Sequence, residues 1–351
     1  MKRMSKLYEF ELGKAAQILV QELFKIKQGE EFVITADTEC DMRVVEATAR
    51  ATFAVGAKPV VVWLASPLGV GKAADPLLPT RTLTAALKEA DAWVEFNNQW
   101  LLYSSPWDKA IEENTKLRYL CLVGMDTDMM IRCIGRVDYR ALLRFQSKVV
   151  EMTKKAKKMR VTNSTGTDVS FKNAPGRPVT LESGYADTPG PHFLSGQIGW
   201  APEHTSINGV IAFDGSIVPP VGLLKEPVKL HVEKGKIQKI TGGKEAVQFE
   251  GWLRSFKDPN MLSLAHICYG FHPGAKLTGN ILEDERVWGC TEWGTGNVGP
   301  MYLPPNGKKA ASHTDGICMN SSVWLDNAQL TDHGKIVHKE LVPLARKLGK
   351  T

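Results

Sequence analysis

The chain has 351 residues, which is enough for two domains of ordinary size. A hydrophobic fraction of 43% and a charged fraction of 23% are typical of a soluble globular protein. The formal net charge of +6 comes without a concentrated basic face, and no apolar stretch is long enough to cross a bilayer, so we expect neither nucleic acid nor a membrane as a partner. The opening residues lack a signal-peptide pattern and the six cysteines lack paired spacing, which together predict a cytoplasmic protein with free, buried thiols.

Helical and extended hydrophobic patterns alternate through the first 160 residues. Apolar residues recur at helical spacing in residues 7–26, 42–55, 82–89, 109–113 and 138–158. Short apolar runs predict strands at residues 31–36, 58–64, 92–96 and 118–124. We interpret the β-branched run at 58–64 as a strand covered on both faces. The alternation predicts an α/β domain over residues 1–160 with a parallel sheet between helices, and no dinucleotide or phosphate-loop fingerprint accompanies it.

The character of the chain changes after Arg160. A polar turn cluster at residues 163–168 is followed by short alternating strands divided by Gly and Pro. Residues 228–240 have the pattern of a β-hairpin with a Lys-Gly turn, and residues 244–256 have the pattern of a helix. We therefore predict a second, mainly β, metal-binding domain over residues 161–351, because residue types that bind metals collect in its later part.

His266, His313 and Asp315 are the candidate metal ligands. Every histidine in the sequence lies at or beyond His192, so the first half contributes none. Side chains alternate along a strand with period two, so a His-x-Asp pair on one strand would point His313 and Asp315 to the same face. With His266 on a neighbouring strand, two histidines and one carboxylate would hold one face of an ion and leave the opposite positions open. That pattern is typical of non-haem Fe(II) oxygenases.

Several motifs follow one another in the second half in a specific order. They are Gly196-Gln197-Ile198, Leu264-Ala265-His266, Glu283-Asp284-Glu285, Gly289 to Asn297, and Ser312-His313-Thr314-Asp315. This order resembles the aminopeptidase T group of two-metal exopeptidases. The resemblance implies that Gln197 and His266 stand in the places of two glutamate ligands and that Glu292 stands in the place of a histidine. Two divalent ions about 3.5–4 Å apart need bridging carboxylates, so we expect the two-metal site to be lost.

The remaining trio resembles the ligand set of the 2,5-dihydroxypyridine 5,6-dioxygenases of nicotinate and nicotine breakdown, which share that scaffold and use Fe(II). The resemblance implies that His192, in a loop rich in Pro and Gly, acts as an acid/base toward the substrate. It also implies a histidine after a Leu-Leu pair in the first domain, where this chain has Tyr103. A phenol cannot replace an imidazole as a base near neutral pH, so Tyr103 bears on the choice of substrate. Glu292 is either a fourth ligand or an acceptor for a ligand imidazole N–H, and we favour the second role. Gln197 is likewise either a further ligand or a residue that contacts the ligands.

These observations predict a mononuclear non-haem Fe(II) dioxygenase that opens a dihydroxylated N-heteroaromatic ring with O₂. The resemblance implies conversion of 2,5-dihydroxypyridine to N-formylmaleamate as the type reaction. The expected partners are a small aromatic substrate and O₂, and we expect a homo-oligomer. Two alternatives stay open: a two-metal aminopeptidase, which Gln197 and His266 argue against, and a non-catalytic binding protein with a vestigial site, which iron content and O₂ uptake would exclude.

Some aromatic and histidine residues near the candidate ligands have two interpretations. Trp200, Trp288 and Trp293 flank these ligands in sequence, and they could line an aromatic pocket or pack in the core. His204 lies in a polar context, as do His231, His333 and His338, and we predict surface positions for all four.

Overall fold

The computed structural model describes residues 6–350, and this part of the chain forms two compact units. The N-terminal unit comprises residues 6–137 together with Glu182–Ser195. The C-terminal unit comprises Asp138–Leu181 and residues 196–350. These bounds differ from the division between residues 160 and 161 that the sequence predicts.

Two elements account for the difference in the bounds. Helix α6 (Tyr139–Lys155) buries Phe145 and Val149 in the hydrophobic core of the C-terminal unit, so the helix belongs to that unit. Strand β8 (Gly190–Phe193) pairs in parallel with β4 (Arg118–Cys121), which returns a later segment to the N-terminal unit. Periodicity shows that a helix has a buried face, but it does not show which sheet covers that face.

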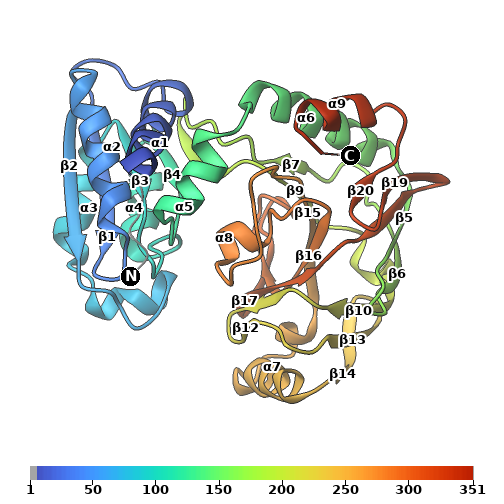
Figure 1. Ribbon diagram of the computed structural model, residues 1–351. Helices are drawn as coiled ribbons and strands as arrows, with labels where there is room; N and C mark the ends of the chain where they lie inside the picture. Colours follow the sequence, from blue (N-terminus) through green and yellow to red (C-terminus); the bar gives the residue numbers. More distant parts are fainter. Residues whose placement is uncertain (1–5, 351) are drawn as a thin grey trace. The chain divides into compact units, whose positions relative to one another are not determined.

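The N-terminal unit is built on a five-stranded sheet of order β2-β1-β3-β4-β8, in which every neighbouring pair is parallel. Figure 1 labels β1, β2, β3 and β4 of this sheet. The other strands of this unit are β1 (Glu31–Asp37), β2 (Lys58–Leu64) and β3 (Ala92–Glu95). Its helices are α1 (Lys6–Gln17), continued as the π-helix η1 (Ile18–Leu23), then α2 (Met42–Ala54), α3 (Thr80–Glu89), α4 (Ser105–Glu113) and the short α5 (Thr127–Met130). The parallel α/β architecture that the sequence predicts is confirmed.

Strand β2 lies at the edge of this sheet, so the prediction that it is covered on both faces is wrong. Among residues 6–350 it pairs only with β1, and Val60, Val61 and Trp63 are each more than 40% exposed. A run of β-branched residues indicates a strand, but an edge strand and a central strand of a parallel sheet can have the same composition.

Two antiparallel sheets form the C-terminal unit. The eight-stranded sheet has the order β14-β13-β10-β6-β5-β18-β19-β20, and the seven-stranded sheet has the order β12-β11-β17-β16-β15-β9-β7. The strands are β5 (Lys158–Thr162), β6 (Asp168–Lys172), β7 (Val179–Leu181), β9 (Gln197–Trp200), β10 (Asn208–Phe213), β11 (Ser216–Val218), β12 (Gly222–Leu223), β13 (Val228–Glu233), β14 (Lys236–Thr241), β15 (Leu264–Gly270), β16 (Cys290–Val298), β17 (Lys308–Cys318), β18 (Ser322–Leu325), β19 (Ala328–Asp332) and β20 (Lys335–Ile336). Helices α7 (Lys244–Ser255), α8 (Ile281–Asp284) and α9 (Val342–Lys347) complete the unit.

Aromatic residues fill the core between the two sheets. The ring of Phe171 in β6 packs edge-on against the ring of Trp293 in β16, with centroids 5.5 Å apart, and Trp200 is 2% exposed. Trp288 packs against Phe145 at 5.0 Å. Of the two interpretations left open, the structure supports core packing for Trp200 and Trp293, and Trp288 is partly buried against the same core.

The structure also shows the state of the cysteines and the length and apolar character of the helices. All six cysteines are free thiols, and five of them are buried, as the sequence predicts. Between residues 6 and 350, none of the helices combines the length and the apolar character that a bilayer-spanning segment needs.

Glu95, at the end of β3, is a fully buried carboxyl group that generates a stability prediction. It accepts hydrogen bonds from the Leu101 backbone N–H and from the Tyr119 hydroxyl. Burial raises the pKa of this carboxyl group from its ordinary value of 4.5 to about 7, although both hydrogen bonds act to lower it.

Replacing Glu95 should change how stability depends on pH. A raised pKa in the folded state contributes stability that is fully present below pH 4.5 and is lost as the pH rises through about 7. Glu95→Gln has no such ionisation, so between pH 5 and pH 8 the wild type should lose up to about 3 kcal/mol relative to the variant. Urea unfolding at both pH values measures this difference, and an identical pH dependence in the two proteins would contradict it.

Candidate metal centre

One face of the seven-stranded sheet carries the candidate ligands. Strand β17 contains His313 and Asp315, which oppose Gly296 and Gly294 of β16. Opposed residues of antiparallel strands point to the same face, and so do residues two apart on one strand. The two side chains of the His-x-Asp pair therefore project from the same face, as the sequence predicts.

Strand β15 adds His266 to this face through a β-bulge. Between two ordinary pairs of β15 and β16, two residues of β15, Ala265 and His266, oppose the single residue Gly294. A bulge changes the direction in which a side chain points. Gly294 leaves the space that the rings occupy, because a Cβ atom there would lie 2.6 Å from Nε2 of His266 and 2.9 Å from Cε1 of His313.

The distances among the three candidate ligands fit a single metal ion. Nε2 of His266 lies 3.2 Å from Nε2 of His313, and Oδ1 of Asp315 lies 2.9 Å from His313 Nε2 and 3.7 Å from His266 Nε2. Two ligand atoms that are each about 2.1 Å from one ion are about 3.0 Å apart at a right angle and about 3.4 Å apart at a tetrahedral angle. The three side chains could therefore hold one ion together.

The side of each imidazole that faces away from the other candidate ligands has an oxygen atom near it, and for His313 this oxygen accepts a hydrogen bond. Nδ1 of His313 lies 2.6 Å from the backbone carbonyl oxygen of Asn297, so Nδ1 carries a proton and donates it, and Nε2 is the nitrogen that faces Asp315. Nδ1 of His266 lies 3.5 Å from Oε2 of Glu292. In both residues the nitrogen that faces the other candidate ligands is Nε2, the one available to bind a metal.

The electrostatics of the cluster also suit a cation. Burial lowers the pKa of His266 to about 3, so its imidazole is neutral, which is the form that binds metals. Burial acts to raise the pKa of Asp315, but the charge and the hydrogen bond of His313 hold it well below its usual range, so this carboxylate is ionised. Burial and the nearby Asp315 raise the pKa of Glu292 well above its usual range. Oε1 of Glu292 is buried without a hydrogen-bond partner in the described part of the chain, as expected of a group that a nearby cation would stabilise.

Glu292 and Gln197 lie next to each other beside the trio. The Gln197 amide, on β9, donates toward Oε2 of Glu292 at 3.5 Å, and both side chains are buried. Because Glu292 approaches His266 from the Nδ1 side, the arrangement supports an acceptor that orients the imidazole. A ligand role for Glu292 would instead use the group formed by His266, Cys268 and Glu292, whose potential ligand atoms lie within 4.8 Å of one another.

Tyr103 and His192, the two residues proposed to act on the substrate, belong to the N-terminal unit. Tyr103 is 55% exposed, and its ring packs edge-on against Trp107 with centroids 5.2 Å apart. His192 is half-buried on β8, with Nε2 2.7 Å from the carbonyl oxygen of Thr188. Their functional roles therefore rest on the family resemblance.

Sequence reasoning missed several residues around the trio. The ring of Tyr302 lies 4.8 Å from that of His266, and its hydroxyl group lies 3.9 Å from Sγ of Cys268. The alternation of Gly294 and Gly296 after Glu292 was an available signal, since glycines at every second position leave space on one face of a strand.

His204 is not the surface residue that its polar sequence context predicts. It is half-buried in the 3₁₀ turn η4 (His204–Ser206), and its Nε2 lies 2.8 Å from the carbonyl oxygen of Ala265. Burial lowers the pKa of His204. A contact between residues 61 positions apart in the chain is not readable from local composition.

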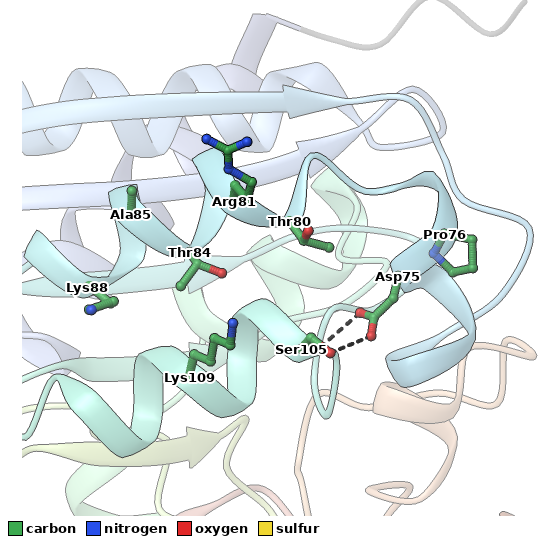
Figure 2. Close-up of a pocket in the computed structure, with 9 residues that line it drawn as sticks. All are labelled: Asp75, Pro76, Thr80, Arg81, Thr84, Ala85, Lys88, Ser105 and Lys109. Atoms are coloured by element: carbon green, nitrogen blue, oxygen red, sulfur yellow. Dashed lines mark hydrogen bonds between the residues drawn. The ribbon is translucent and has the colours of Figure 1, made fainter.

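A cavity of about 790 Å³ lies elsewhere, in the N-terminal unit. Figure 2 shows that residues from α3, α4 and the 3₁₀ segment η2 (Gly71–Leu77) line it. Its cationic side chains are Arg81, Lys88 and Lys109, and the carboxylate of Asp75 is hydrogen-bonded to Ser105. None of the candidate metal ligands contributes to this cavity, so the chemistry of the trio gives the better guide to the functional site.

The fold and the centre together define a class: a parallel α/β unit joined to an antiparallel β unit that carries two histidines and one carboxylate in reach of one ion. The family model described as 2,5-dihydroxypyridine 5,6-dioxygenase (NicX) matches residues 16–338, and the chain belongs to this family. The protein is accordingly an oxidoreductase of the dioxygenase type. The 2,5-dihydroxypyridine 5,6-dioxygenase of Pseudomonas putida is 26% identical over 342 residues, which cover 92% of this chain and 95% of that protein.

Two solved structures show the same fold. The structure of the 2,5-dihydroxypyridine dioxygenase from Pseudomonas putida matches with a TM-score of 0.76 and 22% identity, covering 95% of this chain and 99% of that one. Wild-type AmpT from Thermus thermophilus matches with a TM-score of 0.69 and 15% identity, covering 94% of this chain and all of that one. The scaffold resemblance inferred from the sequence motifs is confirmed.

Filling the space at Gly294 should weaken metal binding. In Gly294→Ala the new methyl group would push the His266 and His313 rings apart, and overpacking of this kind costs about 1–3 kcal/mol, which corresponds to about a fivefold to 150-fold loss of affinity. Anaerobic titration with Fe(II) measures the loss. Gly299→Ala is a matched control, since a Cβ atom there meets nothing within 4 Å. Equal affinities in the two variants would contradict the close approach of the rings.

Proposed function

We propose that the protein is a mononuclear non-haem Fe(II) dioxygenase that opens the ring of a dihydroxylated N-heteroaromatic compound with O₂. The type reaction is the conversion of 2,5-dihydroxypyridine to N-formylmaleamate. The observation that carries the proposal is the trio of His266, His313 and Asp315, whose facing atoms lie within 3.7 Å of one another, in a chain of this dioxygenase family. Such a set binds one face of an ion and leaves the remaining positions for substrate and O₂.

In this proposal His266, His313 and Asp315 would hold the iron, which when bound supplies the redox chemistry with O₂. Asp315 contributes the negative charge, and the carbonyl of Asn297 keeps His313 in the tautomer that presents Nε2. Glu292 orients His266 through Nδ1. All five residues lie in the C-terminal unit, so the proposed iron site is contained in one compact part of the chain.

His192 and Tyr103 are proposed to act on the substrate. The Nε2–H of His192 donates to the Thr188 carbonyl, which leaves Nδ1 as the nitrogen that can accept a proton from a substrate hydroxyl group. Tyr103 offers a phenol that can donate one hydrogen bond to a substrate oxygen or pack against the ring.

The two-metal aminopeptidase alternative has support only from the shared fold. Its difficulty lies in the chemistry of the side chains: Gln197 brings a neutral amide and His266 brings an imidazole where bridging carboxylates would be needed. The buried Gln197 amide donates an N–H toward Glu292. The amide group is neutral, so Gln197 cannot supply the negative charge that a carboxylate would bring.

Metal content and O₂ uptake test the proposal directly. After anaerobic reconstitution with Fe(II), the protein should bind close to one iron per chain, because the trio provides one set of facing ligand atoms. With 2,5-dihydroxypyridine it should then consume O₂, measured with an oxygen electrode. Two tightly bound zinc ions together with peptide hydrolysis would refute the proposal in favour of the aminopeptidase.

The variant His266→Glu separates the two enzyme classes. A glutamate would add negative charge and restore one peptidase-type ligand, but Gln197 would still supply no carboxylate. We expect loss of O₂ consumption without gain of peptidase activity, measured on the same preparation after Fe(II) and Zn²⁺ loading. If the variant still consumed O₂ with substrate, His266 could not be a required ligand.

Removing the Tyr103 hydroxyl group tests the proposed substrate contact. Tyr103→Phe should lower kcat/KM by about tenfold to a few hundredfold, the range for one positioned hydrogen bond of about 1.4–3 kcal/mol. Iron content should not change, and Tyr103→His should shift preference toward 2,5-dihydroxypyridine. Tyr8→Phe is the control, because it removes another phenol of the same unit, one that is bonded to Asp128. Unchanged kcat/KM in both Tyr103 variants would show that Tyr103 is structural.

A further inference from the structure

The bulge in β15 leaves a backbone carbonyl group outside the strand ladder, and a histidine far away in the chain binds it. Ala265 is one of the two bulge residues, and its carbonyl oxygen lies 2.8 Å from Nε2 of His204. A carbonyl oxygen can only accept, so Nε2 of His204 is the donor. A bulge residue lacks a partner in the strand ladder, and a buried carbonyl group without a hydrogen bond is costly. The hydrogen bond from His204 supplies the partner that the neighbouring strand does not give to the Ala265 carbonyl group.

The backbone of His204 is itself held against the start of β15. Gly235, in the turn between β13 and β14, has a φ of +72°, and a Cβ atom there would lie 2.3 Å from the carbonyl oxygen of His204. The Gly235 carbonyl accepts from the N–H of Leu264 at 2.9 Å, and its N–H donates to Ile207 at 2.9 Å. One hairpin turn therefore contacts both the turn that carries His204 and the residue that precedes the bulge.

The orientation of the Ala265 carbonyl determines where His266 points. This carbonyl and the N–H of His266 belong to one planar peptide unit, so fixing the carbonyl direction fixes the plane from which the His266 side chain projects. His204 holds that unit from one side, and the space at Gly294 receives the ring on the other. An ordinary strand pair in place of the bulge would lack both constraints.

We propose that His204 is a positioning residue for the metal centre: its hydrogen bond to Ala265 holds the bulge so that Nε2 of His266 faces His313 and Asp315. The inference rests on the proposed function only in taking these three residues as metal ligands. His204 touches neither the ion nor the substrate in this account, and it acts through the backbone of its neighbour.

Two replacements of His204 test the inference by metal affinity in the absence of substrate. His204→Leu removes the donor, and His204→Gln keeps an N–H that can reach the same carbonyl. Losing a group that hydrogen-bonds a ligand side chain costs about 10–100-fold in metal affinity. His204 acts one step further away, through the backbone, so we expect the lower end of this range, about tenfold, for leucine and less than about threefold for glutamine. Anaerobic titration calorimetry with Fe(II) measures both. His231→Leu is the control, since His231 is another half-buried imidazole, one that is bonded to Thr241 on the neighbouring strand.

A second measurement separates positioning from simple support of the fold. Thermal unfolding with and without Fe(II) should show a smaller metal-induced rise in Tm for His204→Leu than for wild type, because the rise depends on affinity for the folded state. An unchanged affinity, or a loss of Tm that is the same with and without metal, would overturn the inference.

A glycine variant keeps the test available if His204→Leu does not fold. Gly235→Ala places a methyl group against the His204 carbonyl, and Gly176→Ala carries a similar backbone penalty, with a φ of +78° and nothing within 4 Å of the added atom. Weaker Fe(II) binding in Gly235→Ala than in Gly176→Ala supports the inference, and equal binding overturns it. The proposed function can fail separately: a wild-type protein that binds one ion but opens no ring would contradict it. That result would leave the metal-affinity test of His204 unchanged.

Discussion

The candidate metal centre depends on one irregularity in strand pairing, the bulge at Ala265 and His266 opposite Gly294. In a regular ladder, side chains alternate between the faces, and a shift by one residue reverses every one of them. The bulge adds His266 to the face that already carries His313 and Asp315, and the missing side chain at Gly294 lets the two imidazoles approach to 3.2 Å. The opposite face of the same strands, with Trp293, packs in the core, so the backbone that aims the ligands is also the backbone that the core holds rigid.

Charge explains why such a cluster can exist with His266 and Glu292 buried and His313 and Asp315 half-buried. An ionised Asp315, a neutral His266 and the carboxyl group of Glu292 lie together, and the orphaned Oε1 of Glu292 would be costly to bury alone. A divalent cation held by the trio would offset the charge of Asp315 and stabilise Glu292 in its ionised form. The buried amide of Gln197 adds no charge, which suits one ion better than two.

The match to AmpT shows how far sequence can diverge while a fold is kept. The two chains match over 94% of this one at only 15% identity. At that identity most side chains differ between the two proteins, so the shared fold does not carry the chemistry of the site with it. Function on this scaffold must therefore be argued from the side chains of the site and not from the fold.

The sequence by itself determined the helix and strand pattern of the N-terminal unit, the β-rich character of the C-terminal unit and the His313–Asp315 pair, because these depend on local periodicity. It also supplied the family, through motifs spread along the chain. Only the tertiary structure decided that β2 is an edge strand, that α6 packs with the C-terminal unit and that Trp200 and Trp293 are core residues. The tertiary structure alone also decided the bulge at Ala265 and His266 and the role of His204 beside it. The bulge depends on strand register, and the hydrogen bond of His204 joins residues 61 positions apart. No local sequence pattern encodes which distant partner a backbone group finds.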